Sequence, residues 1–223
     1  GATNGSFSLA TNQQLNPTAN AIHAHGDVNL ANTIAYAGNS FNIGSITSDT
    51  GRVKIQADNI GVAYGSINFN VNAATLFNWQ TTNDTVMGVG QAFFDGIQAP
   101  AVKLGGTGQT AAIVLTGAAD LSGTGISTLS FFTEGDAYQA AGATLKVSNF
   151  SAYGANVNFG QLNNIQAFQG RATTGDLGFV TETSLKLTSM DPGNVMPGVR
   201  AANSASILAD GDITSDIVGS YAI

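Results

Sequence analysis

The sequence predicts an all-β fold, an antiparallel β-sandwich of the jelly-roll type with many short strands. Short segments in which apolar and polar residues alternate recur roughly every ten residues, separated by Gly, Asn and Asp. This spacing is typical of sandwiches, barrels and solenoids. The chain also has 12 Asp but only 2 Glu and 4 Lys. Because Glu and Lys favour helices whereas Asp favours turns, long helices are not expected.

The expected strands run from one end of the chain to the other. The first lies at residues 6–10, where alternation places Phe7 and Leu9 on one face. Strands follow over residues 27–30, 40–46, 52–57, 66–71, 111–115, 128–133, 144–150, 156–159 and 184–187. Residues 73–79 best fit a helical turn. The last strand has its apolar residues at odd-numbered positions, namely Ile213, Ile217, Tyr221 and Ile223.

The chain is expected to hold one main domain. Residues 1–22 are polar and predict an extended N-terminal segment, and residues 23–223 predict a single β domain. A Tyr-Gly pair followed by an alternating segment occurs at Tyr64 and again at Tyr153, 89 positions later. Two similar lobes within the β domain are therefore an alternative.

Two segments resemble the repeats of filamentous haemagglutinin-type adhesins. They are Gly26-Asp27-Val28-Asn29-Leu30 and the stretch from Gly51 to Ile60, which begins Gly-Arg-Val-Lys-Ile. In those exported β-helices each short strand ends at a corner in Gly, Asn or Ala, so the resemblance implies a β-solenoid. A solenoid should also show a sustained period, and none continues between Gln80 and Gly125. The sandwich therefore remains the prediction and the solenoid is the alternative.

Composition excludes several classes of protein. Charged residues make up 9% of the chain, and the net charge of −7 comes with scattered basic residues. Nucleic-acid binding is not expected, because it requires a cluster of basic residues to neutralise phosphates. No apolar run approaches the roughly 18 residues of a membrane helix, so no membrane-spanning segment is predicted. The chain starts at Gly1 without Met, which favours removal of an N-terminal signal and an extracellular or cell-surface location.

Motifs that resemble catalytic signatures each lack a required part. The Asp49-Thr50-Gly51 triplet occurs in aspartic proteases, but those enzymes need two carboxylates, and the preceding residues here are polar. The glycine-rich segment 104–110 resembles a phosphate loop, but Gln109 stands where lysine is needed. We therefore predict that the chain is not an enzyme and has neither catalytic nor cofactor-binding residues.

No metal ligand is predicted. His23, His25 and Asp27 would share one face of a strand, but side chains along a single strand lie roughly 7 Å apart and nearly parallel, which suits zinc poorly. The acidic group Asp210, Asp212 and Asp216 reads as a turn before the last strand. Its oxygen ligands leave calcium as an alternative, although no acidic residue occupies the final position of an EF-hand loop. With no cysteine, disulfides and thiolate metal sites are absent.

Three Asn-x-Ser/Thr sequons begin at Asn4, Asn83 and Asn149. About this number is expected by chance in a chain with 21 Asn and abundant Ser and Thr. The sequons permit glycosylation but do not indicate it.

The expected function is that of a structural subunit of an extracellular, self-assembling filament. With only 4 Lys and 4 Pro, the strand edges are poorly protected against pairing with another chain. Copies of the chain are therefore the expected partner, joined by strand addition. The assembly candidates lie in the two terminal strands: Phe7, Leu9, Ile213, Ile217, Tyr221 and Ile223. The alternative is a secreted module that binds surface glycans as a monomer, although neither aromatic platforms nor regular Thr-x-Thr ranks are evident in the sequence.

Overall fold

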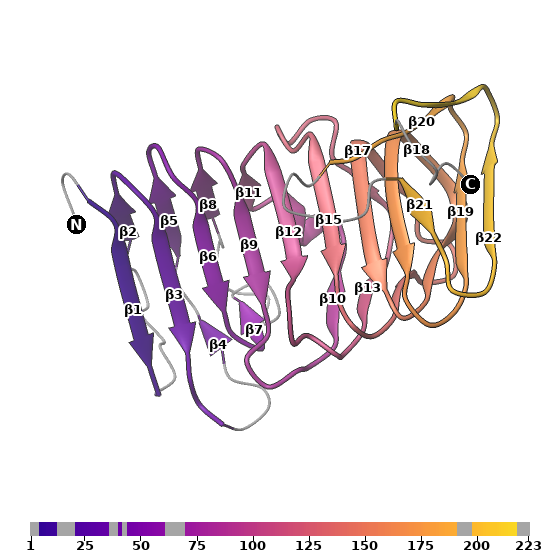
Figure 1. Ribbon diagram of the computed structural model, residues 1–223. Helices are drawn as coiled ribbons and strands as arrows, with labels where there is room; N and C mark the ends of the chain where they lie inside the picture. The colour runs from indigo at the N-terminus through magenta and orange to yellow at the C-terminus, as the bar shows by residue number, and fades with distance from the viewer. Residues whose placement is uncertain are drawn as a thin grey trace.

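The computed structural model describes residues 5–12, 21–35, 40–41, 44–60, 70–190 and 198–217. The chain winds into a parallel β-solenoid of about seven turns (Figure 1). The prediction of an all-β chain is confirmed, but the antiparallel jelly-roll sandwich is wrong. Each strand pairs in parallel with a strand one coil further along the chain, as in β1 with β3, β3 with β6 and β6 with β9. The solenoid alternative describes the fold.

The front sheet of Figure 1 runs along the whole solenoid. Its strands are β1 (Phe7–Thr11), β3 (Val28–Asn32), β6 (Val53–Gln56), β9 (Phe77–Gln80), β12 (Ala101–Gly105), β15 (Thr128–Phe132), β17 (Leu145–Gly154), β18 (Val157–Ala172), β20 (Leu185–Leu187), β21 (Val199–Arg200) and β23 (Ile213–Ser215). Strands β17 and β18 are longer than the others because each continues around a corner of the coil.

The other sides of the coil are built from shorter strands. One side holds β2 (Ala21–Ala24), β5 (Ser45–Ser48), β8 (Asn70–Ala73) and β11 (Ile97–Gln98). Another holds β10 (Met87–Val89), β13 (Ile113–Leu115), β16 (Ala137–Gln139), the first part of β18, β19 (Leu177–Thr181) and β22 (Ala205–Ala209). The remaining elements are β4 (Ser40–Phe41), β7 (Asn59–Ile60), β14 (Ala119–Asp120) and α1 (Gln91–Phe94).

Unequal coil lengths explain why the sequence shows no sustained period. The step between paired residues is 25 for Val28 and Val53, 18 for Asn149 and Ala167, and 29 for Gly170 and Val199. Corners of different length absorb these differences, while the strands stay in register. Alternation of apolar residues shows which face of a strand is buried but not whether the neighbouring strand is parallel. The local sequence pattern therefore could not exclude the antiparallel sandwich.

The core consists of columns in which one inward side chain per coil stacks on the next. Five buried phenylalanines occupy the C-terminal half, with ring centroids 5.6 Å apart for Phe131 and Phe150, 5.9 Å for Phe150 and Phe168, and 3.9 Å for Phe168 and Phe179. Phe159 packs against Phe150 at 4.5 Å. Phe150 and Phe168 stack because parallel register pairs them, whereas the other contacts join phenylalanines that are not register partners, so the aromatic cluster packs across the core as well as along it.

A buried asparagine holds the corner at which β18 changes sides. Asn163 is fully buried, and its Oδ1 accepts a hydrogen bond from Leu145 N at 2.9 Å. Its Nδ2 donates to carbonyl oxygens of Gln161 at 2.8 Å and Val180 at 3.0 Å. The Gln139 amide is the side-chain partner of both atoms. This amide therefore satisfies backbone groups of three successive coils that the corner leaves unpaired.

Several local predictions need correction. The helical turn expected at 73–79 is wrong, because Ala73 ends β8 and Phe77 begins β9. The two haemagglutinin-like segments form β3 and β6, which are neighbours in register. The N-terminal segment contributes β1 to the front sheet and β2 to the next side. Tyr64, the first copy of the proposed internal duplication, lies outside the described residues, whereas Tyr153 lies in β17.

Candidate functional site

A protruding loop interrupts the regular surface of the solenoid at one corner. Residues 121–127 join β14 to β15, where Asp120 pairs with Lys146 and Thr128 pairs with Asn149. Seven residues in this coil therefore lie opposite only two residues of the next, Val147 and Ser148. β18 crosses the same corner in two residues as well, between Asn164 and Ala167. The loop stands out as a wall beside two flat coils.

The loop is held in one shape by its own hydrogen bonds and by two buried side chains. Leu121 and Ile126 are 1% and 4% exposed and anchor its ends in the core. The backbone N–H and the hydroxyl of Thr124 both donate to Leu121 O, at 3.1 and 2.9 Å. Ser127 is fixed by two further bonds to Pro100 O. The wall is therefore preformed rather than shaped by a ligand.

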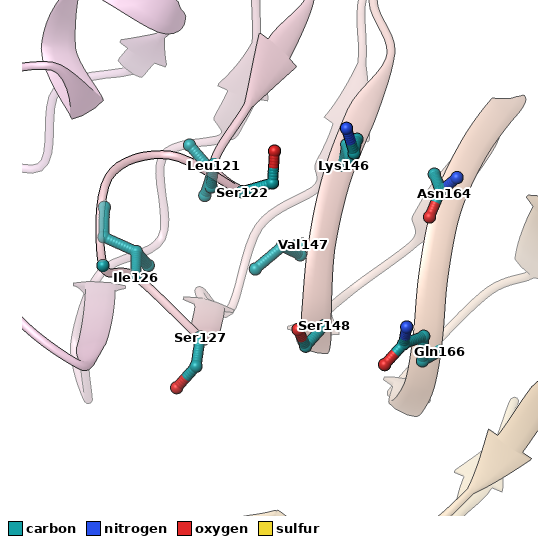
Figure 2. A pocket seen from close by; sticks show the side chains of 10 residues that line it. Leu121, Ser122, Ile126, Ser127, Lys146, Val147, Ser148, Asn164 and Gln166 are labelled. Atoms are coloured by element: carbon teal, nitrogen blue, oxygen red, sulfur yellow. The ribbon is translucent and has the colours of Figure 1, made fainter.

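Figure 2 shows the hollow beneath this loop, with a volume of about 300 Å³. Leu121, Ser122, Gly125, Ile126 and Ser127 line it from the loop, and the rest of the lining comes from the next two coils: Lys146, Val147, Ser148, Asn164 and Gln166. Within the described residues, the side chains of Ser148 and Gln166 have no hydrogen-bond partner. Their hydroxyl and amide can therefore bind a ligand without breaking an internal bond.

A second hollow of about 420 Å³ adjoins the first and shares Lys146 and Asn164 with it. Its lining adds Gln91, Asp120, Glu182 and Leu162, whose side chain is 63% exposed. We call the two hollows together the corner groove. The groove thus combines hydroxyls, amides, one ammonium group, two carboxylates and an exposed apolar side chain.

Hydrogen bonds between neighbouring coils fix the charged groups of the corner groove. Lys146 Nζ donates to Asp120 Oδ2 at 3.0 Å, and Asn164 Nδ2 donates to Glu182 Oε1 at 3.0 Å. The Gln91 side-chain oxygen accepts the backbone N–H of Asp120 at 2.6 Å. These side chains extend from five successive coils, so the parallel register sets their spacing.

Asp120 is ionised at neutral pH. Hydrogen bonds from the Ser122 hydroxyl and backbone N–H, then from Lys146, lower the pKa of this carboxyl to about 2. The Ser122 hydroxyl lies 2.6 Å from Asp120 Oδ1. Asp120 therefore acts as a hydrogen-bond acceptor in the groove and not as a proton donor.

The predicted assembly residues occupy both ends of the solenoid. Phe7 and Leu9 lie in β1, partly buried against the core. Ile213 lies in β23 and is 44% exposed, whereas Ile217 follows that strand and packs against the core. Tyr221 and Ile223 lie outside the described residues.

The two histidines lie beside Asp49 and not beside Asp27, the carboxylate that the sequence suggested. His23 Nε2 lies 2.9 Å from Asp49 Oδ1, and His25 Nδ1 lies 3.7 Å from the other oxygen of Asp49. Asp27 instead pairs with Arg52 at 3.1 Å. Asp49 begins the Asp-Thr-Gly triplet, so that triplet serves as a turn in which the carboxylate faces two imidazoles.

The C-terminal acidic group is also divided. Asp216 pairs with Lys186 at 2.7 Å and accepts a hydrogen bond from the Thr188 hydroxyl at 3.1 Å, and these bonds lower its pKa. Asp210 and Asp212 lie in the turn between β22 and β23. No group of three or more His, Cys, Asp or Glu that could hold a metal ion occurs among the described residues.

Two of the three sequon asparagines use their amide nitrogen within the fold. Asn83 Nδ2 donates to Ile34 O and to Asp58 Oδ2, both at 2.9 Å. Asn149 Nδ2 donates to Ser127 O at 3.1 Å, next to the corner groove. Asn4 lies outside the described residues.

Comparison of the chain with protein-family models, with curated proteins and with solved structures finds no match. Within the described part of the chain, no helix is long and apolar enough to cross a membrane.

Proposed function

We propose that this chain is a secreted adhesive module that binds a surface glycan in the corner groove. The observation that carries the proposal is the groove floor, where Ser148 and Gln166 present unpartnered polar side chains beside Lys146 and Asn164 (Figure 2). These groups project from the paired strands β17 and β18, which makes the floor rigid. A preformed floor avoids much of the ordering cost of binding.

The chemistry of the corner groove suits a sugar. Each sugar hydroxyl both donates and accepts hydrogen bonds, and serine hydroxyls and glutamine or asparagine amides can do the same. The ionised Asp120 and the ammonium group of Lys146 add one strong acceptor and one strong donor. The exposed Leu162 offers an apolar contact for the C–H face of a sugar ring. The volume of each hollow lies in the usual range for small-ligand sites.

Asp120 suits binding of a ligand and not general-acid catalysis. A glycosidase needs a carboxylic acid whose raised pKa keeps it protonated near neutral pH. The pKa of Asp120 is shifted in the opposite direction, to about 2. We therefore propose retention of an intact glycan, as expected of an adhesin.

The groove is tested by the double substitution Asn164→Ala and Gln166→Ala. We expect glycans bound by the unsubstituted chain on an array to bind this variant about tenfold more weakly, because two hydrogen bonds of roughly 0.5–1.5 kcal/mol are lost. The matched control is Asn72→Ala with Gln98→Ala, which removes one exposed Asn and one exposed Gln from paired strands of another side. Equal weakening of both variants, or no glycan bound by the unsubstituted chain, contradicts the proposal.

A second candidate, the extracellular filament, is favoured by the last described coil. Ile213 is 44% exposed although its in-register neighbour Leu185 in the preceding coil is 1% exposed. Within the described residues, Ile213 is thus an apolar side chain that no further coil covers, and a copy of the chain could cover it by adding its β1 edge.

For this candidate we expect unbranched fibres of the unsubstituted chain in negative-stain micrographs. Ile213→Asp should prevent them without unfolding the solenoid, since this exposed side chain contributes little to the core. Deletion of residues 1–12 should have the same effect on the fibres. Monodisperse monomers of the unsubstituted chain at high concentration would contradict the filament and leave the groove proposal intact.

A further inference from the structure

Basic and acidic side chains are segregated in this chain. Five of the seven basic residues lie on strands of the front sheet away from the groove corner: Lys54, Lys103, Arg171, Lys186 and Arg200. The eleven strands described above for that sheet contain no Asp or Glu, whereas β14, which pairs with the start of β17, carries Asp120 at the groove corner. These eleven strands therefore carry basic charge only, and the carboxylates that reach them, Asp216 beside Lys186 and Asp120 beside Lys146, come from flanking segments.

The acidic residues lie mainly at corners because they cap turns there. Asp58 Oδ1 accepts the backbone N–H groups of Thr82 and Asn83 at 3.0 and 2.8 Å. Asp176 Oδ1 accepts that of Ser204 at 3.1 Å. Short acidic side chains are well suited to this role. Structural demands thus explain where the carboxylates are, but they do not explain the basic residues of the front sheet.

Four of the side chains on the outer face of the front sheet form a ladder along the solenoid axis. Phe132 and Tyr153, paired residues of β15 and β17, stack with centroids 4.4 Å apart and planes 5° apart. Lys103 Nζ lies over the Phe132 ring, 4.7 Å from its centroid, and the Arg171 guanidinium carbon lies over the Tyr153 ring, 5.5 Å from its centroid. We call these four residues the cation–aromatic ladder.

The two cations of the ladder are not neutralised by the protein. Arg52, Lys146 and Lys186 each pair with an aspartate. Within the described residues, by contrast, neither Lys103 nor Arg171 forms an ion pair. Cation–π attraction to the rings restrains both groups without using their N–H donors in an ion pair.

We infer that the cation–aromatic ladder binds a linear, carboxylated polysaccharide that lies along the solenoid axis. Charge complementarity selects an anion, and the planar fork of Arg171 matches a carboxylate in bidentate geometry. The two cations are three strands apart, or about 14 Å at a strand spacing of about 4.8 Å. This spacing suits a sugar polymer, in which neighbouring carboxylates are at least one ring apart, better than duplex DNA, which has a charge about every 1.7 Å.

The ladder is distinct from the corner groove and goes beyond the proposed function. It differs in ligand class, since the groove presents mostly neutral polar groups and the ladder presents unpaired positive charge. Neither site shares a residue with the other.

The test compares two double variants that remove the same charges. Lys103→Gln with Arg171→Gln removes the ladder cations, whereas Lys186→Gln with Arg52→Gln removes one lysine and one arginine that already have aspartate partners. Binding is measured to polygalacturonate, to its fully methyl-esterified form and to a thymidine oligonucleotide, at low and at physiological salt. Thermal melting of each variant checks that it is folded.

We expect the unsubstituted chain to bind polygalacturonate but not the methyl ester, with affinity falling as salt rises. The ladder variant should bind about tenfold more weakly, and the control variant within about twofold of the unsubstituted chain. The ladder variant should keep its binding to any neutral glycan of the corner groove, which separates the two proposals. No binding to polygalacturonate, equal binding to the ester or the oligonucleotide, or equal losses in both variants would overturn the inference.

Discussion

Phe168→Ala is expected to lower the free energy of unfolding by about 3–5 kcal/mol, the range for removing a fully buried phenylalanine. Phe168 is completely buried, and its ring contacts both Phe150, its register partner in the preceding coil, and Phe179. Truncation leaves a cavity between two coils whose spacing is fixed by backbone hydrogen bonds, so the neighbours cannot close it. Denaturant unfolding followed by circular dichroism measures the change.

Phe132→Ala is the matched control for this substitution. Phe132 is only partly buried on the outer face of the front sheet, where its ring stacks on Tyr153. Its loss should cost clearly less than that of Phe168, because little of the removed surface was buried in the core. Equal destabilisation by the two substitutions would show that the column does not hold the coils together as described.

Asn163→Leu is expected to destabilise the chain by about 3–5 kcal/mol although it replaces a polar residue by an apolar one in the core. The substitution leaves Leu145 N–H and the carbonyl of Val180 without the side-chain partner that Asn163 provides. Each buried polar group without a partner costs roughly 1–3 kcal/mol. The Gln139 amide also loses its partner. Denaturant unfolding again gives the measurement.

Two further variants separate hydrogen bonding from side-chain shape. Asn163→Asp keeps the shape and the acceptor oxygen but loses the donors and buries a charge, so it should be at least as destabilising. Asn164→Leu changes the adjacent, partly exposed residue and should cost less than about 1 kcal/mol. If Asn163→Leu proves neutral, the amide is not what holds the corner of β18.

Local alternation predicted strand positions well but could not predict which strands pair. The segments expected at 52–57 and 128–133 correspond closely to β6 and β15. Pairing depends on coil length, and the 18- to 29-residue steps conceal the repeat. Some strands were missed although they alternate locally, such as β12, with Val102 and Leu104 buried, and β19, with Leu177 and Phe179 buried.

The candidate sites were hidden for a related reason. Phe132 and Tyr153 are 21 residues apart, so their stacking is visible only once β15 and β17 are known to be in register. The corner groove is visible only when the 121–127 loop is compared with the two coils beside it. Residues 121–127 carry the Ser, Gly and Thr composition of a loop, which was a usable signal for a protrusion. Nothing in that composition shows what lies next to it.

The uneven corners also bear on how such a chain can change over generations. The strands pair in register whether a coil contains 18 or 29 residues, so insertions and deletions at a corner leave the strands on either side undisturbed. A surface loop such as 121–127 can therefore be lengthened, exchanged or lost in a single event at low thermodynamic cost. Recognition surfaces can diversify by corner replacement while the aromatic interior is inherited unchanged.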